Sequence, residues 1–267
     1  GGNTPSVAVL GDGPEPRLII DAGTGIRGIT ENIGGTAFNG TILLTHLHWD
    51  HIQGLPFCGS LDNDESKVNV LIPEQGETVE LLKRVMSPPF FPIQPDELRG
   101  DWSFAGLEQG DFDIEGFNIR AREVPHKGGR TFGYRISEEE SAFTYVSDHN
   151  PTDIGPGPDG LGEYHEAILE LCENSDLLLH DSQYTAADFP ERSTWGHSAV
   201  EYAVGLAEAA GVKRLVLFHH APNRTDVEID AIVAQFSDAG VSVEAAVEGS
   251  TIVVGESHHA PVSGGAG

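Results

Sequence analysis

The segment Thr41–His51 reads Thr-Ile-Leu-Leu-Thr-His-Leu-His-Trp-Asp-His. Its apolar, β-branched first half predicts a buried strand that ends just before the histidines. Residues i and i+2 of an extended chain point the same way, so His46 and His48 can bind one metal ion together. Asp50 and His51 follow at an expected helix start, where they can face a second ion. Imidazole and carboxylate groups suit Zn²⁺, and also Mn²⁺ or Fe.

These four groups are too few for two ions, so we expect further ligands elsewhere in the chain. His126, Asp148 and His219 each come at or just after the end of another apolar run. A single polar residue at a strand end is commonly only a turn residue. Together with the first motif, however, the three residues complete a plausible ligand set.

Short apolar runs bounded by Gly, Asp, Asn or Pro recur along the chain and predict strands. The expected strands are Val7–Leu10, Leu18–Asp21, Thr41–Thr45, Val68–Ile72, Phe117–Glu123, Phe132–Ile136, Ala142–Ser147, Leu177–Asp181, Arg214–Phe218, Val241–Ala245 and Thr251–Val254. Helical spacing predicts helices at Glu77–Met86, Glu163–Cys172, Ser198–Ala210 and Asp226–Ala239. The pattern favours sheets with helices packed outside.

The pattern His-x-His-x-Asp-His after an apolar strand resembles the signature of the metallo-β-lactamase superfamily. The upstream segment Leu18–Gly25 resembles its first motif, in which an aspartate, here Asp21, orders the metal-binding loop. The likeness covers essentially the whole chain, and it is strongest to the branch that holds tRNase Z and the cyclic phosphodiesterases of phosphonate breakdown. It implies a fold of class α/β (α+β), namely a four-layer αββα sandwich with the metals at one sheet edge.

The resemblance also implies two divalent ions as cofactors, with Zn²⁺ favoured over Mn²⁺ or Fe. The residues that match the family's ligand positions are His46, His48 and His126 for one ion, Asp50, His51 and His219 for the other, and Asp148 as the bridge. His220 competes with His219, but the family places this ligand directly after the strand. His149 and His180 are expected to be structural neighbours, because adjacent histidines rarely both bind an ion.

A catalytic acid is implied by two further segments of that branch, His-Glu-Ala-Thr and Gly-His-Ser-Thr. Here they read His-Asp-Ser-Gln from His180 and Gly-His-Ser-Ala from Gly196. The resemblance makes His197 the acid that protonates the leaving alkoxide, with Asp181 orienting it and raising its pKa. Asp50 is counted as catalytic with them. The alternative is that His197 only begins a helix, and Asp181 is shorter than the family's glutamate.

Two divalent ions a few ångströms apart lower the pKa of a bridging water, so that hydroxide is available near neutral pH. We therefore predict a metal-dependent hydrolase, with a small or cyclic phosphodiester as the first choice of substrate. Hydrolysis of esters or lactones on the same site is the second choice, followed by β-lactam cleavage. A non-catalytic metal-binding module is the alternative from another class.

The charge of the chain limits its partners. Fifteen Lys and Arg stand against 42 Asp and Glu, a net charge of −27. A tRNA would have to lie across this acidic surface, so a small-molecule substrate is expected rather than a nucleic acid. Lys127, Arg130 and Arg224 follow ligand positions and are candidates for substrate binding at the mouth; the alternative is solvated surface charge.

We expect one domain over residues 1–255 and a flexible tail over 256–267, which contains His258 and His259. No run of residues approaches 18 apolar positions, so no membrane partner is expected, and a cytoplasmic location is predicted. The Pro- and Phe-rich segment Ser87–Pro95 is expected to be irregular and is a candidate lid or homodimer contact.

The acidic residues are spread along the chain without a long run, a pattern typical of salt-adapted proteins. We therefore predict that activity persists at molar NaCl, which an assay of metal-dependent turnover across a salt series would measure. Inactivation or aggregation as NaCl is raised would contradict this.

Overall fold

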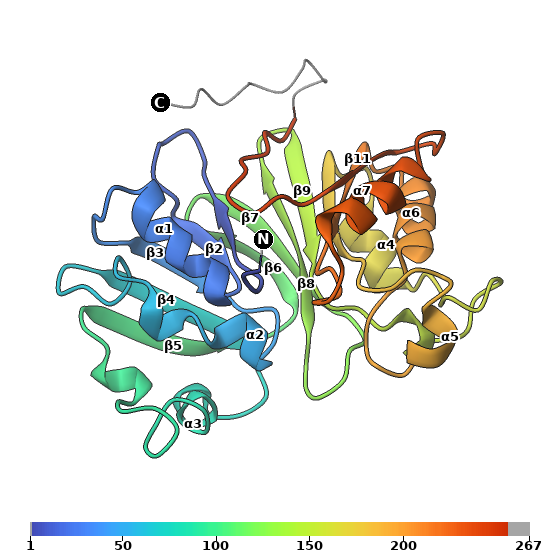
Figure 1. Cartoon of the computed structure of the whole chain (residues 1–267). Helices are drawn as coiled ribbons and strands as arrows, with labels where there is room; N and C mark the ends of the chain where they lie inside the picture. The colour runs from blue at the N-terminus through green and yellow to red at the C-terminus, as the bar shows by residue number, and fades with distance from the viewer. Residues whose placement is uncertain (1, 256–267) are drawn as a thin grey trace.

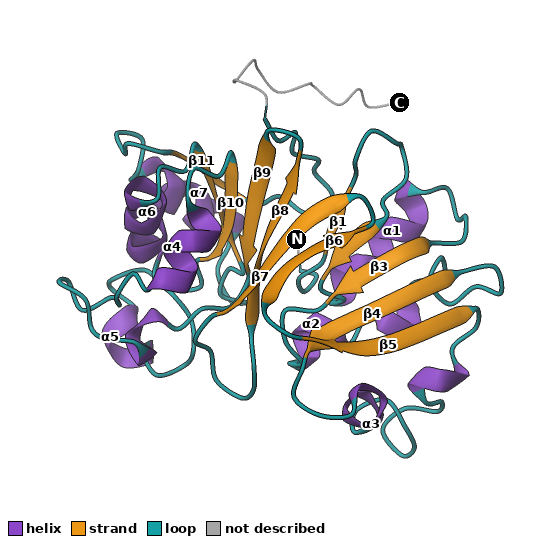
Figure 2. Ribbon diagram, turned by 180° about the vertical axis from the view of Figure 1, so that it is seen from behind, coloured by secondary structure: helices purple, strands orange, loops and turns teal. Residues whose placement is uncertain are grey.

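The computed structural model describes residues 2–255 and places their strands in two sheets (Figures 1 and 2). The first sheet has the order β1-β2-β3-β4-β5, with strands Val7–Val9, Leu18–Ile20, Asn39–Leu43, Lys67–Pro73 and Asp101–Leu107. The second has the order β12-β11-β10-β9-β8-β7-β6. In chain order from β6 to β12 its strands are Gly110–Ile114, Phe117–Glu123, Phe132–Glu138, Ser141–Val146, Leu177–Asp181, Arg214–Phe218 and Ser242–Ala245.

The helices cover the outer faces of the two sheets (Figure 2). Three of them, α1, α2 and α3, lie with the first sheet and span Arg27–Asn32, Trp49–Ile52 and Thr78–Lys83. On the side of the second sheet lie α4, α5, α6 and α7, which span Glu166–Cys172, Phe189–Arg192, Val200–Ala209 and Asp226–Ala234. The order of layers is therefore helix, sheet, sheet, helix, and the αββα fold predicted from the resemblance is confirmed.

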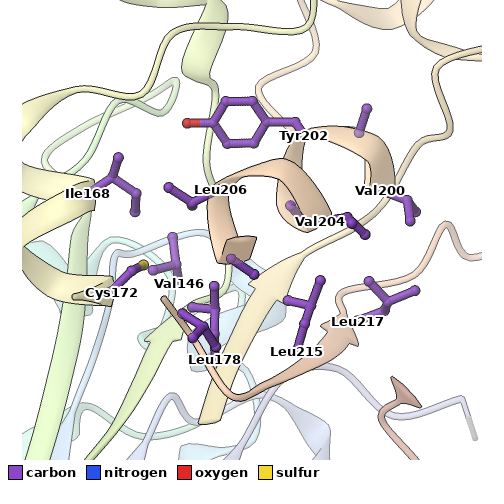
Figure 3. Packing of buried hydrophobic residues seen from close by; sticks show 14 of the residues in the cluster. Val146, Ile168, Cys172, Leu178, Val200, Tyr202, Val204, Leu206, Leu215 and Leu217 are labelled. Carbon is purple, nitrogen blue, oxygen red and sulfur yellow. The ribbon is translucent and has the colours of Figure 1, made fainter. Parts of the chain in front are cut away.

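Three apolar cores fill the spaces between these four layers. Alternation along each strand sorts its side chains between two cores, because successive residues point to opposite faces. In β2, Ile19 packs toward the helices of the first sheet, while Leu18 and Ile20 enter the core between the sheets. In β10, Leu178 instead joins the core beneath α4, α6 and α7 (Figure 3). Strands buried on both faces explain the continuous apolar runs in the sequence.

The direction of the strands brings several chain segments to one edge. Strands β2 and β3 are parallel, as are β9, β10 and β11. Strand β8 is antiparallel to both β7 and β9, so β7 and β9 run in the same direction. The carboxyl ends of these strands in the second sheet therefore lie along one edge, and the segments that leave them carry the candidate ligands.

The expected strand at Thr251–Val254 was wrong, since the structure forms none there. Ile252 and Val254 instead pack against the core between the sheets, which explains their alternating pattern without strand pairing. Strands β5 and β6 were not predicted. Most of their side chains are exposed or half-buried, so neither shows a clear apolar run.

Several other expectations can be compared with the structure. Of the segment Ser87–Pro95, residues 87–94 form no helix or strand, as predicted, and Pro95 begins the short 3-10 helix Pro95–Glu97. Phe91 packs on Phe57, while Phe90 is 80% exposed. No helix within residues 2–255 has the length and apolar character that a bilayer crossing requires. The tail with His258 and His259 lies outside the described residues.

One buried hydrogen bond ties the two sheets together just ahead of the histidine motif. The hydroxyl of Tyr134 in β8 donates to the carbonyl oxygen of Leu44 at 2.8 Å. Tyr134→Phe removes this donor inside the core and should lower the free energy of unfolding by about 1–3 kcal/mol, measured by urea denaturation. Tyr164→Phe is the control, since within residues 2–255 that hydroxyl makes no hydrogen bond. Equal effects of the two substitutions would contradict the assignment.

Candidate metal centre

The candidate ligands come from segments that leave four strands at the shared edge. Strand β3 ends at Leu43, two residues earlier than predicted, and Trp49 begins α2. Asp50 and His51 therefore lie in the first turn of a helix, as the sequence indicated. His126 lies beyond β7, Asp148 beyond β9 and His219 directly after β11.

A first group consists of His46, His48, His126 and Asp148, whose ligand atoms all lie within 4.8 Å of one another. His126 Nε2 is 3.2 Å from His48 Nδ1 and 3.4 Å from Asp148 Oδ2. His46 Nε2 is 3.7 Å from the same carboxylate oxygen. Three nitrogens and one oxygen thus converge on one point.

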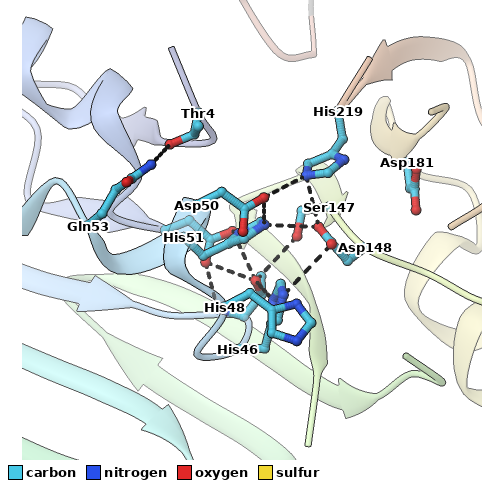
Figure 4. Close-up of polar contacts among 12 residues, drawn as sticks. Thr4, His46, His48, Asp50, His51, Gln53, Ser147, Asp148, Asp181 and His219 are labelled. Carbon is cyan, nitrogen blue, oxygen red and sulfur yellow. Dashed lines mark hydrogen bonds and ion pairs between the residues drawn. The ribbon is translucent and has the colours of Figure 1, made fainter. Parts of the chain in front are cut away.

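A second group consists of Asp50, His51 and His219, whose ligand atoms also lie within 4.8 Å of one another. His219 Nε2 is 3.3 Å from Asp50 Oδ2, and His51 Nε2 is 3.5 Å from it. The other oxygen of Asp148, Oδ1, lies 3.1 Å from His51 Nε2 and 3.5 Å from His219 Nε2. Asp148 therefore stands between the two groups with one oxygen toward each (Figure 4).

The side chains present fit a pair of cations. His46 Nε2 is a buried atom without a hydrogen-bond partner, and His51 Nε2 and Asp148 Oδ1, also buried, lie 3.1 Å apart without the geometry of a hydrogen bond. Such atoms cost free energy when they are left unpaired, and all three point into the space between the groups. A set of imidazole nitrogens with carboxylate oxygens suits Zn²⁺ and neighbouring transition ions.

In several of these histidines the ring nitrogen that faces away from this space contacts a polar partner. That contact fixes the orientation of the ring. His51 Nδ1 lies 2.8 Å from Asp21 Oδ2, and His126 Nδ1 lies 2.6 Å from the carbonyl oxygen of Gly196. His46 Nδ1 is 3.0 Å from the hydroxyl of Thr45. Partners of this kind select the tautomer whose free nitrogen can bind an ion.

Asp21 is the centre of this outer layer, as the resemblance implied. Its buried carboxylate accepts hydrogen bonds from the backbone and hydroxyl of Thr45 and from the hydroxyl of Tyr145 at 3.0 Å. Its backbone has a φ of 60°, a left-handed conformation that residues other than glycine rarely adopt. His219 shares this feature with a φ of 54°, so two residues of the site hold strained backbone.

The protonation state of the first group matches that of a metal site. Burial lowers the pKa of His46, His48 and His126, which favours neutral imidazole. Burial acts to raise the pKa of the Asp148 carboxyl, but His219 and His51 lower it more and hold it well below its usual range. Neutral nitrogens around an ionised carboxylate are the form that binds a cation.

Beside the second group lies the pair that the sequence proposed for acid catalysis. His197 Nδ1 is 3.0 Å from Asp181 Oδ2, and the ring of His197 stacks on that of His219 with centroids 5.0 Å apart. Burial opposes protonation of His197, but the carboxylates of Asp181 and Asp148 raise its pKa to about 9. Backbone amides, among them that of Ser198, donate to Asp181 and hold its carboxylate in place. The shorter aspartate thus reaches His197.

Three further histidines form a hydrogen-bonded chain behind Asp181. His149 Nδ1 is 3.2 Å from His180 Nε2, and His149 Nε2 is 3.2 Å from His165 Nε2. His180 Nδ1 lies 2.7 Å from the carbonyl oxygen of Asp181. In residues 2–255 none of the three belongs to a group that could hold an ion, and the same holds for His220. The placement therefore favours His219 over His220 as the ligand.

The three residues proposed for substrate binding differ in their surroundings. Arg130 pairs with Glu108 at 2.9 Å and Glu123 at 3.1 Å, and Arg224 pairs with Asp188 at 2.8 Å. A substrate would have to compete with these carboxylates for either guanidinium. Lys127 is exposed, and no ion pair of its ammonium is recorded within the described residues.

Sequence reasoning missed other residues that hold the site. The side-chain amide of Gln183 lies 3.0 Å from His219 Nδ1, although nothing in the sequence marked this glutamine. Gly128 and Gly196 leave room for ligands, because a Cβ atom would stand 2.7 Å from His48 Nε2 at the first and 3.0 Å from the His126 ring at the second. Both glycines have positive φ, so their conformation also favours glycine.

Comparison with known proteins agrees with this geometry. The family model of the β-lactamase superfamily domain matches residues 16–220, and the chain therefore belongs to the β-lactamase superfamily. This confirms the family expected from the histidine motif and, with it, a hydrolase of that superfamily.

Curated relatives include the ribonuclease Z of Exiguobacterium sibiricum, 27% identical over 226 residues that cover 70% of this chain and 73% of the relative. The ribonuclease Z of the archaeon Haloarcula marismortui is 25% identical, with coverage of 89% and 86%.

Two solved structures share the fold. A diphosphatase from the PhnP family has a TM-score of 0.65 at 19% identity and covers 96% of this chain and 85% of its own. The short form of human tRNase Z has a TM-score of 0.61 at 21% identity, with coverage of 82% and 86%.

The contacts of Asp21 lead to a prediction about metal affinity. Asp21→Asn replaces one acceptor oxygen with a donor facing His51, Thr45 or Tyr145, and should weaken binding of one of two Zn²⁺ ions by about 10- to 100-fold. Competition with a chromophoric chelator measures this. Asp176→Asn is the matched control, because that buried carboxylate pairs with Lys213. Unchanged affinity for both ions in Asp21→Asn would refute the assigned role.

Proposed function

We propose that this protein is a dinuclear metal-dependent phosphodiesterase that acts on small or cyclic phosphodiesters. The observation that carries the proposal is the placement of Asp148, with one oxygen toward His46 and His126 and the other toward His51 and His219. The two groups would hold one ion each, with Asp148 shared. Zn²⁺ is the first choice, and Mn²⁺ or Fe would also suit these ligands.

When bound, the two ions supply a water nucleophile ionised near neutral pH and positive charge beside the scissile phosphate. The chain itself supplies orientation and a proton. Asp181 accepts from His197 Nδ1, which leaves Nε2 of that imidazole to face a substrate. A proton at Nε2 can pass to the oxygen of the leaving alkoxide, and Asp181 stabilises the protonated ring beforehand. Asp50 and His219 face the same space beneath that ring, and Gln183 contacts the other nitrogen of His219.

The choice of a small substrate follows from charge. Relatives named ribonuclease Z and a fold neighbour described as a diphosphatase favour a phosphate ester over a lactone or β-lactam. With roughly +4 from two ions and −2 from Asp50 and Asp148, the pocket attracts a small anion. The chain as a whole, without ions, carries a net charge of −27, which opposes the binding of a long polyanion.

The proposal is tested with bis(p-nitrophenyl) phosphate and purified protein, stripped of metal and then supplied with Zn²⁺ or Mn²⁺. We expect turnover that depends on added metal and disappears with a chelator. Cyclic nucleotides, a lactone, a cephalosporin and a precursor tRNA, assayed at matched metal, then separate the substrate classes. Absence of metal-dependent turnover on all of them would favour a non-catalytic metal-binding module.

The proposed role of His197 predicts a dependence on the leaving group. His197→Ala should leave metal content unchanged and reduce turnover of an alkyl phosphodiester by about 10²- to 10⁴-fold. The loss should be much smaller for a nitrophenyl ester, because that leaving group departs without a proton. His165→Ala, which removes a histidine of the chain behind Asp181, is the control. An equal loss by His197→Ala on both esters would rule out the acid role.

A further inference from the structure

Two exposed tryptophans adjoin the metal centre. The chain contains three tryptophans, and Trp49 and Trp195 are 70% and 63% exposed. The third, Trp102, is half-buried in β5 and stacks on Phe104 with centroids 5.9 Å apart. Exposing an indole forgoes the free energy of burying its large apolar surface. A chain that uses so few tryptophans thus presents two of them beside one site.

The segments that carry these indoles meet at His126. Trp49 lies between His48, which belongs to the first group, and Asp50, which belongs to the second. His48 Nδ1 is 3.2 Å from His126 Nε2. On the other side of the ring, His126 Nδ1 is 2.6 Å from the carbonyl oxygen of Gly196. Trp195 directly precedes that glycine, so the segments that carry the two indoles adjoin opposite nitrogens of the His126 ring.

The backbone that carries both indoles is fixed, while the rings themselves are exposed to solvent. A Cβ atom at Gly196 would lie 3.0 Å from His126, so the chain after Trp195 is packed tightly against the ligand histidine. Trp49 starts α2, and the next residues of that helix enter the second group. Lys127 lies beside Gly196, since its Cβ lies 3.8 Å from the position of a Cβ at that residue. We call Trp49, Trp195 and Lys127 together the rim. It combines two exposed indole rings with one exposed ammonium group.

We propose that Trp49 and Trp195 bind the nucleobase of the substrate, so that the site prefers phosphodiesters in which one ester group is a nucleoside. This inference rests on the proposed function and deepens it. Flat aromatic rings stack on nucleobases with little dependence on sequence, and the ammonium of Lys127 attracts the adjoining phosphate. A base held by the rim leaves its phosphate over the two groups of ligands. A single nucleoside suffices, so the acidic surface elsewhere is no obstacle.

Two esters with the same leaving group test this specificity. Thymidine 5′-(p-nitrophenyl phosphate) and methyl p-nitrophenyl phosphate each take up one water as the phosphorus–oxygen bond breaks, and each releases p-nitrophenolate. The ratio of their kcat/KM values isolates the contribution of the nucleoside, because damage to the metal centre affects both. We expect a ratio well above one. It should fall about tenfold or more in Trp49→Ala and in Trp195→Ala, and stay unchanged in the control Trp102→Phe.

Binding provides a readout that does not depend on turnover. Titration with thymidine 5′-monophosphate should quench tryptophan fluorescence saturably, whereas ribose 5-phosphate should not, and the double variant Trp49→Ala/Trp195→Ala should lose the quenching. Quenching without hydrolysis of either ester would sustain the base-binding rim and refute the proposed phosphodiesterase. A nucleoside ratio near one in the wild type, or a ratio that both alanine variants retain, would overturn the inference. Self-association abolished by Trp49→Ala, with no base-dependent quenching, would assign the indoles to a contact between two copies instead.

Discussion

The carboxylate of Asp148 is buried between two clusters of imidazole nitrogens, and the rest of the site is arranged around it. One of its oxygens lies 3.1 Å from His51 Nε2 without forming a hydrogen bond, and His46 Nε2 has no hydrogen-bond partner. A protein interior rarely leaves three polar atoms without hydrogen bonds so close together. The two sheets must pack face to face with these strand ends at the same edge for the atoms to converge, because His46 and His51 follow β3 in one sheet and Asp148 follows β9 in the other. The bond from Tyr134 to Leu44 and the contacts of Asp21 hold that junction.

The charge of the protein acts at two scales. Across the surface, a net charge of −27 disfavours long polyanions and favours solubility in concentrated salt. Within the centre, two ions would outweigh the charges of Asp50 and Asp148 and create a local attraction for one phosphate. The rim adds Lys127 and two indoles, which carry no negative charge. A small nucleoside phosphodiester is compatible with both the acidic surface and the positive centre, because it enters the centre without extending over the surface.

Much of this arrangement could be predicted from the sequence, because the motif from His46 to His51 is compact and the buried strands are continuous apolar runs. The candidate ligands outside the motif could be proposed because they stand at strand ends. The edge strands β5 and β6 could not be predicted, since exposed edge strands carry no strong apolar pattern. His149 and His180 were expected to be structural, but their hydrogen bonds to one another and to His165, and the contact of Gln183, could not be predicted, because they join distant segments. The apolar spacing of Thr251–Val254 led to a wrong prediction of a strand. A segment that packs on a core can show the same alternation of apolar residues as a paired strand.

The most direct test of the account is the location of metal ions in crystals of the protein grown with Zn²⁺, measured by anomalous diffraction at the zinc edge. The account predicts two peaks roughly 3.5–4 Å apart. One should lie among His46, His48 and His126, and the other beside His51 and His219, with Asp148 between them. A single peak at full zinc loading, or peaks placed instead at the histidine chain behind Asp181, would contradict it.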